Sequence, residues 1–300
     1  MKKIVVTGAT SFIGIHLIEQ LLAKEYYVYA IVRRNSKNLY RLIPKPNLNI
    51  IELDMEEYSD IPSFIKEAEC FCHLAWDGVR MPQRDNREIQ QTNYWCSVEA
   101  MKAAKKIRCQ RFIGIGSQAE YGKMTGKITE EYPCNPNTEY GKAKLETKNT
   151  LEELSKRLNI EFVWVRVFSL YGKYDYKGSL IMSCIDKMKK NDKIELTQCI
   201  QMWDYLHVYD AARAIIALIE HMEPAEIYNI ASGDSKELKA YVEDMRHWLK
   251  SKSVVEYGAI PYVDNNIVNF EPSVDKLKKD TGWIPKIDFQ DGINMLIAEK

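Results

Sequence analysis

A stretch close to the amino terminus constrains the fold more than any other part of the chain. Three β-prone residues, Ile4 to Val6, lead into a turn of small residues, and apolar positions then recur at helical spacing. This order predicts a strand, a tight turn and a helix. Gly8 permits the turn, and Gly14 lets the helix lie close to the strand. The helix would present backbone N–H groups to a pyrophosphate, so the stretch predicts a dinucleotide-binding turn rather than an ordinary connection.

The turn follows the pattern G-x-x-G-x-x-G, except that Ser11 stands at the middle glycine position. The predicted strand before it and helix after it are the context that the dinucleotide interpretation requires. The residues expected to contact the dinucleotide here are Gly8, Thr10, Ser11, Phe12, Ile13 and Gly14.

The second predicted strand, residues 26–32, leads into Arg33, Arg34 and Ser36. In folds of this kind an acidic residue about twenty positions after the glycines holds the ribose 2′-hydroxyl. Arginines occupy that place here. Two guanidinium groups and a hydroxyl suit a 2′-phosphate, so the sequence favours NADP(H) over NAD. Exposed basic residues at a strand end, with no ligand, are the alternative.

Apolar, β-prone runs alternate with helical patterns through residue 168. Further strands are predicted at 49–53, 70–74, 111–115 and 161–168, with long helices at 86–106 and 139–157. The alternation predicts an α/β fold with a Rossmann-type, doubly wound parallel sheet, in which ligands bind beyond the carboxyl ends of the strands. Later in the chain we expect helices at 178–190, 209–221, 238–249, 273–281 and from about 290, and a strand at 226–231.

This pattern divides the chain into two parts without a flexible linker rich in Gly, Pro or Ser. Residues 1–168, together with about 202–231, are expected to form the NADP-binding domain. Residues 169–201 and 232–300 are expected to form a smaller carboxyl-terminal lobe that binds substrate. The lobe should pack directly on the domain.

The composition narrows the classes of function. Lys and Arg number 42, as do Asp and Glu, so a net charge of zero gives no electrostatic case for nucleic acid or an anionic membrane. The seven cysteines and five histidines show no metal-ligand spacing, and we expect reduced thiols and no metal. Neither a signal-like segment nor a membrane-length apolar run is present, so we expect a soluble, cytoplasmic protein.

The strongest chemical signal is the pair Tyr140 and Lys144, four residues apart at the start of a predicted helix and therefore on one face. An ammonium group close to a tyrosine favours the phenolate. Lys144, helped by the charge of the cofactor, is therefore expected to lower the Tyr140 pKa and make Tyr140 a general acid or base. Ser117, at a predicted strand end, could hydrogen-bond the same reacting oxygen. A helix surface on which Tyr and Lys merely neighbour each other is the alternative.

Taken together, these motifs resemble the short-chain dehydrogenase/reductase superfamily, and within it the extended branch that acts on nucleotide sugars. The resemblance runs nearly end to end. It implies that Ser117, Tyr140 and Lys144 form a catalytic trio. Segments that match the branch also lie at 166–172, 204–210, 228–233 and 281–285. Further cofactor contacts implied by the resemblance are Asp54, Met55, Leu74, Ala75, Trp76, Asn93, Tyr140, Lys144 and Phe168.

The departures from the branch are informative. Trp203 stands where an Arg often contacts the substrate diphosphate. Gln118 and Ala119 stand where the 4,6-dehydratases have an Asp-Glu pair, which excludes water elimination. Segments 75–78, 117–122 and 203–206 are most similar to C4-ketoreductases of the CDP-abequose and dTDP-fucose synthase kind. The resemblance implies substrate contacts from Trp76, Ser117, Gln118, Tyr140, Ser169 and Trp203.

The function that this resemblance implies is NADPH-dependent reduction of the keto group of a nucleoside-diphosphate 4-keto-6-deoxyhexose. One alternative is a nucleotide-sugar 4-epimerase that recycles tightly held NAD. The other is an inactive Rossmann protein that senses NADP, although such proteins usually lack the Tyr/Lys pair. The family also implies a homodimer through the helices at 86–106 and 139–157, the first of which carries an apolar face of Tyr94, Trp95, Val98 and Met101. The alternative is that this face only packs on the sheet.

Overall fold

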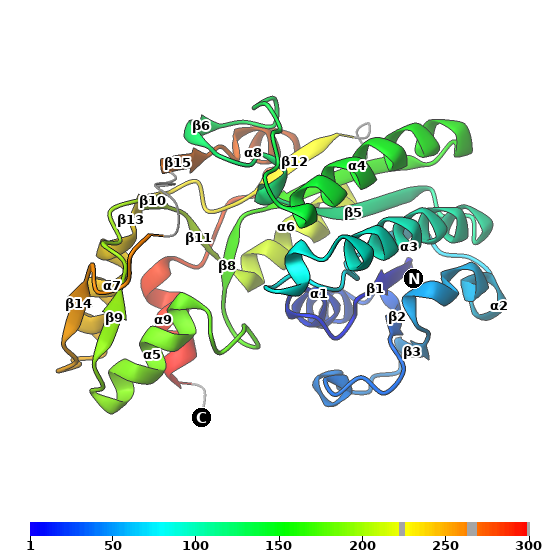
Figure 1. Ribbon diagram of the computed structural model, residues 1–300. Helices are drawn as coiled ribbons and strands as arrows, with labels where there is room; N and C mark the ends of the chain where they lie inside the picture. Colours follow the sequence, from blue (N-terminus) through cyan, green and yellow to red (C-terminus); the bar gives the residue numbers. More distant parts are fainter. Residues whose placement is uncertain (222–225, 263–268, 299–300) are drawn as a thin grey trace.

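Seven parallel strands form one sheet through the centre of the computed structural model, which describes residues 1–221, 226–262 and 269–298 (Figure 1). The order across the sheet is β12-β7-β5-β4-β1-β2-β3. The strands are β1 (Lys3–Thr7), β2 (Tyr27–Val32), β3 (Leu48–Glu52), β4 (Cys70–His73), β5 (Arg111–Ser117), β7 (Glu161–Val167) and β12 (Ile227–Ile230). The predicted Rossmann-type sheet is therefore confirmed. Parts of the two predicted domains, at 222–225, 263–268 and 299–300, lie outside the described residues.

The order of the strands reverses at β1. The chain first adds β2 and β3 on one side of β1 and then crosses to its other side to add β4 and β5. Thr7 at the end of β1 pairs in parallel register with His73 at the end of β4. In open parallel sheets the crevice beyond the carboxyl ends of two such strands is where ligands bind.

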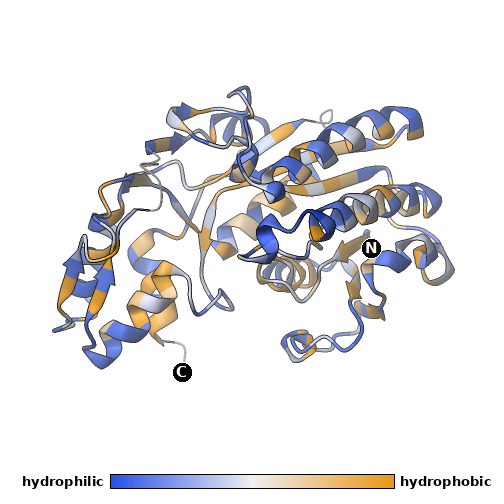
Figure 2. Ribbon diagram, viewed as in Figure 1, coloured by the Kyte–Doolittle hydropathy of each residue, from blue (hydrophilic) through white to orange (hydrophobic). Residues whose placement is uncertain are grey.

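Helices cover both faces of the sheet (Figure 1). Helices α1 (Phe12–Ala23) and α6 (Val208–Glu220) pack together on one face, and α3 (Arg87–Lys106) and α4 (Glu139–Leu158) on the other. Because both faces are covered, the central strands are hydrophobic along most of their length, as Figure 2 shows.

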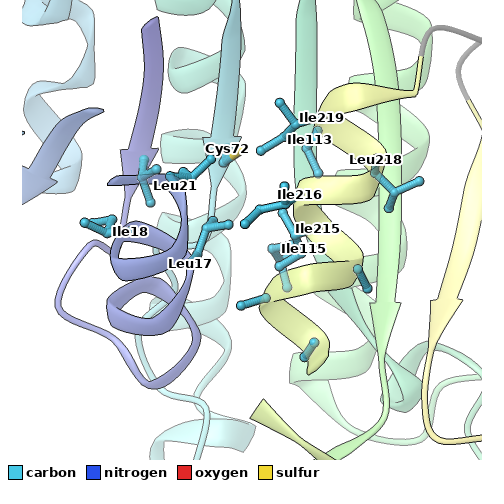
Figure 3. Close-up of a cluster of buried hydrophobic side chains, with 14 of the residues drawn as sticks. Leu17, Ile18, Leu21, Cys72, Ile113, Ile115, Ile215, Ile216, Leu218 and Ile219 are labelled. Atoms are coloured by element: carbon cyan, nitrogen blue, oxygen red, sulfur yellow. The ribbon is translucent and has the colours of Figure 1, made fainter. Parts of the chain in front are cut away.

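The core on the α1 and α6 side is made of aliphatic side chains from both helices that meet the sheet (Figure 3). Leu17 and Leu21 of α1 and Ile215 of α6 are each at most 1% exposed, and they lie with Ile113 of β5 in one cluster. Full burial of such a side chain contributes about 1.5–3 kcal/mol. This packing holds α1 against the sheet, and with it the turn that precedes α1.

Beyond the sheet, α5 (Leu180–Lys190), α7 (Leu238–Trp248) and α9 (Phe289–Ala298) enclose a separate apolar cluster, at the left of Figure 1. Two short strands, β9 (Ile194–Leu196) and β14 (Val255–Tyr257), pair in parallel beside it. Three further two-stranded pairs are β8 (Ser169–Tyr171) with β11 (Tyr205–His207), β10 (Met202–Trp203) with β13 (Lys236–Glu237), and β6 (Thr125–Ile128) with β15 (Asn269–Pro272).

Most predicted elements agree with the structure to within a few residues, and the differences have local causes. The helix predicted from residue 178 begins at Leu180, because Ser179 caps it by accepting a hydrogen bond from the Met182 amide. The tail helix predicted from 273 is α8 (Asp275–Thr281). The short paired strands after residue 120 were not predicted, since two to four residues carry no readable periodicity. Within the described ranges, no helix has both the length and the apolar character needed to cross a bilayer.

Candidate active site

The turn after β1 is tightly constrained by its neighbours. The Ser11 hydroxyl caps α1 by accepting a hydrogen bond from the Gly14 amide at 3.1 Å. Gly8 has a φ of +65°, and a Cβ there would lie 2.7 Å from the Ala75 nitrogen. A Cβ on Gly14 would lie 2.3 Å from the Gly8 oxygen. The predicted strand, turn and helix are confirmed, and so is the close approach that Gly14 allows.

Neighbouring side chains fix the ends of β1 and β4 against each other. The His73 ring forms hydrogen bonds with the Thr7 hydroxyl at 2.8 Å and the Ser97 hydroxyl at 3.0 Å. Burial lowers the pKa of His73 to about 3, so this histidine is neutral. The Leu74 amide also donates to the Thr7 hydroxyl. Leu74 and Ala75, both predicted cofactor contacts, are thereby held beside the Gly8 turn.

The two arginines after β2 have different surroundings. Arg34 forms ion pairs with Glu57 and with Asp54, the latter at 3.4 Å, and its backbone nitrogen donates to Asp54 as well. Arg33 lies 3.6 Å from Asp77, and both side chains are more than half exposed. Such an exposed pair contributes little and is easily exchanged for another anion. The structure thus leaves Arg33 more available to a phosphate than Arg34, a distinction the sequence did not suggest.

The remaining predicted cofactor contacts near the end of β1 lie after β2, after β3 and at the start of α1. The Ser36 hydroxyl lies 3.1 Å from the Thr10 hydroxyl, which joins the end of β2 to the dinucleotide turn. Met55 begins a 3₁₀ helix after β3 and packs, half-buried, against the apolar cluster under α3. Phe12 and Ile13 form the start of α1.

Asn93 on α3 is buried and supports the loop after β4. Its side-chain oxygen accepts from the Asp77 amide, and its side-chain nitrogen donates to the Asp77 carbonyl, both at 2.8 Å. Gln90, one turn earlier, accepts from the indole nitrogen of Trp76 at 2.8 Å. The structure therefore gives Asn93 an anchoring role, and its predicted direct contact with the cofactor stays a prediction.

Trp76, Tyr140 and Lys144 come together at the carboxyl end of the sheet. The Lys144 nitrogen lies 3.5 Å from the centre of the Trp76 ring and donates to the Ile115 carbonyl at 2.6 Å. The Tyr140 ring meets the Trp76 ring edge-on, with centres 6.1 Å apart. Trp76 directly follows Ala75, and the Ala75 backbone lies beside Gly8. The loop after β4 therefore contacts both the Tyr140 and Lys144 side chains and the turn between β1 and α1.

Burial dominates the electrostatics of this pair. Burial lowers the pKa of Lys144 to about 7, and the Glu120 carboxylate opposes this shift. Burial raises the pKa of Tyr140, against a hydrogen bond with Ser117 and the positive charge of Arg84. In the chain itself Lys144 does not offset the burial of Tyr140, because both groups are buried and the ammonium faces Trp76 and a carbonyl. The prediction that Lys144 and the cofactor charge together lower the Tyr140 pKa stays a prediction.

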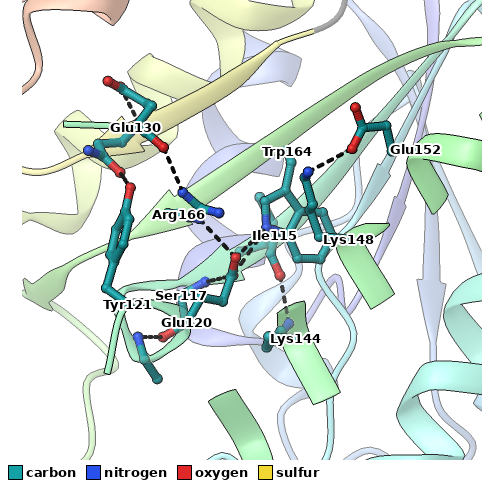
Figure 4. A network of polar contacts seen from close by, with 12 residues as sticks. Ile115, Ser117, Glu120, Tyr121, Glu130, Lys144, Lys148, Glu152, Trp164 and Arg166 are labelled. Atoms are coloured by element: carbon teal, nitrogen blue, oxygen red, sulfur yellow. Dashed lines mark hydrogen bonds and ion pairs between the residues drawn. The ribbon is translucent and has the colours of Figure 1, made fainter. Parts of the chain in front are cut away.

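A fully buried carboxylate organises the backbone of Ser117 (Figure 4). Glu120 accepts hydrogen bonds from the Ser117 amide at 2.7 Å, from the Trp164 indole at 3.0 Å and from Arg166 at 2.9 Å. Burial by itself lowers the pKa of Arg166, but the charge and hydrogen bond of Glu120, together with Tyr121 and Cys134, raise it by more, so the pKa of Arg166 is raised overall. The Ser117 hydroxyl in turn accepts from the Ala119 amide.

Sequence reasoning missed Glu120, although a signal was present. Ser117 and Glu120 stand at the spacing S-x-x-E of a capping box, and the structure shows that box at the start of the 3₁₀ helix Gln118–Glu120. The sequence did not reveal that Arg166 is the ionic partner of Glu120. Arg166 lies on β7, directly opposite Gly116 of β5 in the sheet.

Two of the predicted substrate contacts have a buried polar atom that lacks a hydrogen-bond partner. Among the described residues, the side-chain oxygen of Gln118 and the indole nitrogen of Trp203 are buried without a hydrogen-bond partner. Buried polar atoms without partners are rare and call for an explanation such as a ligand. The Trp203 ring packs against Phe270, with centres 5.0 Å apart.

Phe168 connects β7 to β8, and Ser169 is the next residue. Ser169 begins β8 and is half-buried. Phe168 is buried in an apolar cluster between Tyr121 and Phe270. Its ring is thus part of the packing between the sheet and β15, and its predicted cofactor contact stays a prediction.

Comparison with known proteins agrees with this arrangement. The model of the NAD dependent epimerase/dehydratase family matches residues 4–231. The chain is 26% identical over 313 residues to CDP-abequose synthase of Salmonella muenchen, covering 100% of this chain and 98% of the relative. It is 25% identical over 233 residues to dTDP-4-dehydro-6-deoxyglucose reductase of Escherichia coli, covering 75% and 72% of the two chains.

Solved structures share the fold over nearly the whole chain. The UDP-N-acetylglucosamine 4-epimerase of Methanobrevibacter ruminantium, 22% identical, superposes with a TM-score of 0.88 and covers 100% of this chain and 99% of its own. The UDP-glucuronic acid 4-epimerase of Bacillus cereus, in complex with NAD and 20% identical, has a TM-score of 0.86 and covers 98% and 94%. Since the family model matches well over half of the chain, the protein belongs to the NAD-dependent epimerase/dehydratase family.

Proposed function

We propose that the protein is an NADPH-dependent reductase of nucleoside-diphosphate 4-keto-6-deoxyhexoses. The observation that carries this proposal is the cluster of Tyr140, Lys144 and Trp76 beside the Gly8 turn. In this proposal Tyr140 is the proton donor, and the turn between β1 and α1 binds the pyrophosphate. The two relatives named above, a CDP-abequose synthase and a dTDP-4-dehydro-6-deoxyglucose reductase, support the substrate class.

The residues fit a dinucleotide. A Cβ on Gly8 would collide with the Ala75 backbone, and one on Gly14 with the Gly8 carbonyl oxygen. The two glycines therefore permit the tight turn that presents the amino terminus of α1, which we propose binds the pyrophosphate. We infer that Arg33 and Ser36 hold the 2′-phosphate, because Arg33 is exposed and Ser36 lies beside Thr10 of the turn. We infer that Leu74 and Ala75, whose amides donate to the Thr7 hydroxyl, contact the dinucleotide beside that turn. The dinucleotide, when bound, supplies the hydride for the carbonyl carbon.

Tyr140 is the proton donor in this proposal. Because burial raises its pKa, the phenol stays protonated at neutral pH, as an acid for ketone reduction must be. Its proton passes to the carbonyl oxygen of the substrate. The Ser117 hydroxyl stabilises the same oxygen, and Glu120 holds the Ser117 backbone in place.

Lys144 has a different role from Tyr140: it binds the dinucleotide in this proposal. Its side chain is buried against Trp76, and its pKa of about 7 leaves it partly protonated near neutrality. In the protonated form it offers donors beyond the one that the Ile115 carbonyl takes, and these would hold the nicotinamide ribose.

The substrate is proposed to bind between the sheet and the lobe of residues 169–201 and 232–300. Gln118, Ser169 and Trp203 would contact it, and the unpartnered polar atoms of Gln118 and Trp203 support that placement. Gln118 and Ala119 in place of an Asp-Glu pair favour reduction over dehydration.

A 4-epimerase that recycles tightly bound NAD is the second candidate. The ion pairs of Arg34 with Asp54 and Glu57 favour it, since they bring two carboxylates to the end of β2, and an acidic residue at that strand end commonly holds a ribose 2′-hydroxyl in this fold. The purified protein should be desalted and its bound nucleotide identified. Retained NAD with no NADPH oxidation supports the epimerase, whereas NADPH oxidation coupled to a 4-keto sugar supports the reductase.

We also propose that the protein is a cytoplasmic homodimer formed through α3 and α4. Trp95 on α3 is 59% exposed, which is unusual for so large an apolar side chain. Sedimentation at micromolar concentration should give the mass of a dimer, and Trp95→Glu should shift it toward the monomer. A monomer for the unmodified protein would contradict the proposal.

A further inference from the structure

Two further arginines, Arg80 and Arg84, lie in the loop between β4 and α3, away from the turn between β1 and α1. The Arg84 guanidinium is centred 4.6 Å from the middle of the Tyr140 ring. Tyr140 is only 8% exposed, and Arg84 is half-buried. A guanidinium at this distance from an aromatic ring is attracted to it electrostatically, and the attraction grows where water is excluded.

The loop holds Arg84 in this place through several contacts. Asp85 accepts a hydrogen bond from the Glu139 amide at 3.1 Å, and Glu139 is the first residue of α4, next to Tyr140. Gln90 donates to the carbonyl oxygens of Gly78 and Gln83 from inside α3. Arg84 itself donates to the Val79 carbonyl. The loop is thus tied to both helices that flank the candidate site.

Four polar or charged side chains face Tyr140 from the surrounding elements. The Lys144 nitrogen, on α4, is 5.8 Å from the ring centre, farther than Arg84. The Ser117 side chain favours the ionised form of Tyr140 and so lowers its pKa, whereas the negative charge of Glu120 raises that pKa. Of the two cations, Arg84 is the nearer to the ring centre, and its positive charge favours the phenolate.

We propose that Arg84 is a positioning residue that acts through Tyr140: its guanidinium lies on the ring and stabilises the negative charge that develops when the phenol gives up its proton. This inference rests on the proposed function, in which Tyr140 is the acid. In that step the Tyr140 O–H bond breaks and its proton joins the carbonyl oxygen, while the carbonyl carbon accepts a hydride from the reduced dinucleotide. Arg84 thus takes the electrostatic role that the sequence had suggested for Lys144.

The first test measures Tyr140 directly and needs no activity. The protein is labelled with ¹³C at tyrosine Cζ, and the Tyr140 signal is assigned by its loss in Tyr140→Phe. Arg84→Gln should raise the titration midpoint of Tyr140 by about one pH unit, a tenfold change in proton affinity. Arg84→Lys should restore most of the shift. Titration curves that are the same in the unmodified protein and Arg84→Gln would overturn the inference.

Arg80 provides a matched control from the same loop, because its guanidinium lies 4.2 Å from the centre of the Tyr176 ring rather than on Tyr140. Arg80→Gln removes the same charge and a comparable ring contact. It should leave the Tyr140 titration unchanged. A shift as large as that of Arg84→Gln would show a general effect of loop charge and would also overturn the inference.

The second test uses the reaction. In Arg84→Gln, the high-pH limb at which ketone reduction falls should move upward with the Tyr140 midpoint. A raised KM for the sugar nucleotide with an unmoved limb would instead make Arg84 a substrate-binding residue and contradict this inference. If no 4-keto sugar is reduced at all but the midpoint shifts as expected, the proposed function fails while the pairing of Arg84 with Tyr140 stands.

Discussion

The side-chain nitrogen of Lys144 lies 3.5 Å from the centre of the Trp76 ring and 5.8 Å from the centre of the Tyr140 ring. The lysine that the Y-x-x-x-K spacing pairs with Tyr140 is therefore packed mainly on a tryptophan. Trp76 is also in edge contact with Tyr140, so the indole packs against both groups that the sequence placed side by side. This arrangement has consequences for stability as well as for chemistry.

Lys144 should make the stability of the protein depend on pH. Its pKa is lowered from 10.5 to about 7 in the folded protein, so the unfolded chain binds the proton more tightly. Folding therefore becomes more favourable as pH rises from about 7 to about 10.5, by up to about 1.4 kcal/mol per pH unit. Below pH 7 the cost of burying the charge is constant.

Lys144→Met removes this dependence. Relative to the unmodified protein, the variant should be most stabilised near pH 7, and the difference should shrink toward pH 10. Urea unfolding at several pH values measures it. Lys142→Met is the control, since Lys142 pairs with Glu139 on the exposed side of the same helix. Equal pH slopes for the unmodified protein and Lys144→Met would contradict the lowered pKa.

Glu120 should contribute to both stability and rate. Removing one partner of a buried ion pair leaves the other uncompensated and costs about 3–5 kcal/mol. Glu120→Gln keeps the shape of the side chain, so thermal unfolding should show a clear loss and kcat should fall because the Ser117 backbone loses its charged acceptor. The measurement is unfolding together with steady-state kinetics.

The control for Glu120→Gln lies at the other end of the same two strands. Glu161 accepts from Arg111 at 2.6 Å, but the Glu161 side chain is 45% exposed. Exposure screens the pair, so Glu161→Gln should cost about 1 kcal/mol or less and leave kcat unchanged. If the two variants lowered kcat equally, Glu120 would have no special relation to Ser117.

Arg33 should carry most of the preference for NADPH. Replacing both Arg33 and Arg34 with Ala should weaken NADPH by about 1.5–3 kcal/mol while leaving NADH nearly unchanged, as expected for a charge-assisted contact. Because Arg34 is already paired with Glu57 and Asp54, Arg33→Ala alone should produce most of the effect. Calorimetric binding of both dinucleotides measures it, and equal binding of NADH and NADPH by the unmodified protein would remove the assignment.

The sequence was sufficient for features whose cause is local. The strand and helix around Gly8 follow from a few adjacent residues, and the structure shows the close approach that Gly14 permits. The ionic partners of Arg34 and Glu120 could not be found in that way. Arg34 meets Asp54 because β2 pairs with β3, and Glu120 meets Arg166 because β5 pairs with β7. Such partners are set by strand order, which periodicity alone does not reveal.

The raised pKa of Tyr140 has the same kind of cause. Spacing along α4 brings Lys144 within one helical turn of Tyr140. It does not show that Trp76, from the loop after β4, lies against both side chains, nor that Arg84 lies on the Tyr140 ring. Burial of Tyr140 by segments distant in the sequence raises its pKa, and the spacing along α4 could not show this.

The most direct test of the account is NADPH oxidation by the unmodified protein and by Tyr140→Phe, assayed with nucleoside-diphosphate 4-keto-6-deoxyhexoses. Tyr140→Phe removes only the phenolic oxygen, so dinucleotide affinity should change little while kcat falls by about 10²–10⁴-fold, as for loss of a general acid. The unmodified protein should consume one NADPH for each hydroxyl formed. Turnover by Tyr140→Phe at close to the normal rate would contradict the assignment of Tyr140 as the proton donor.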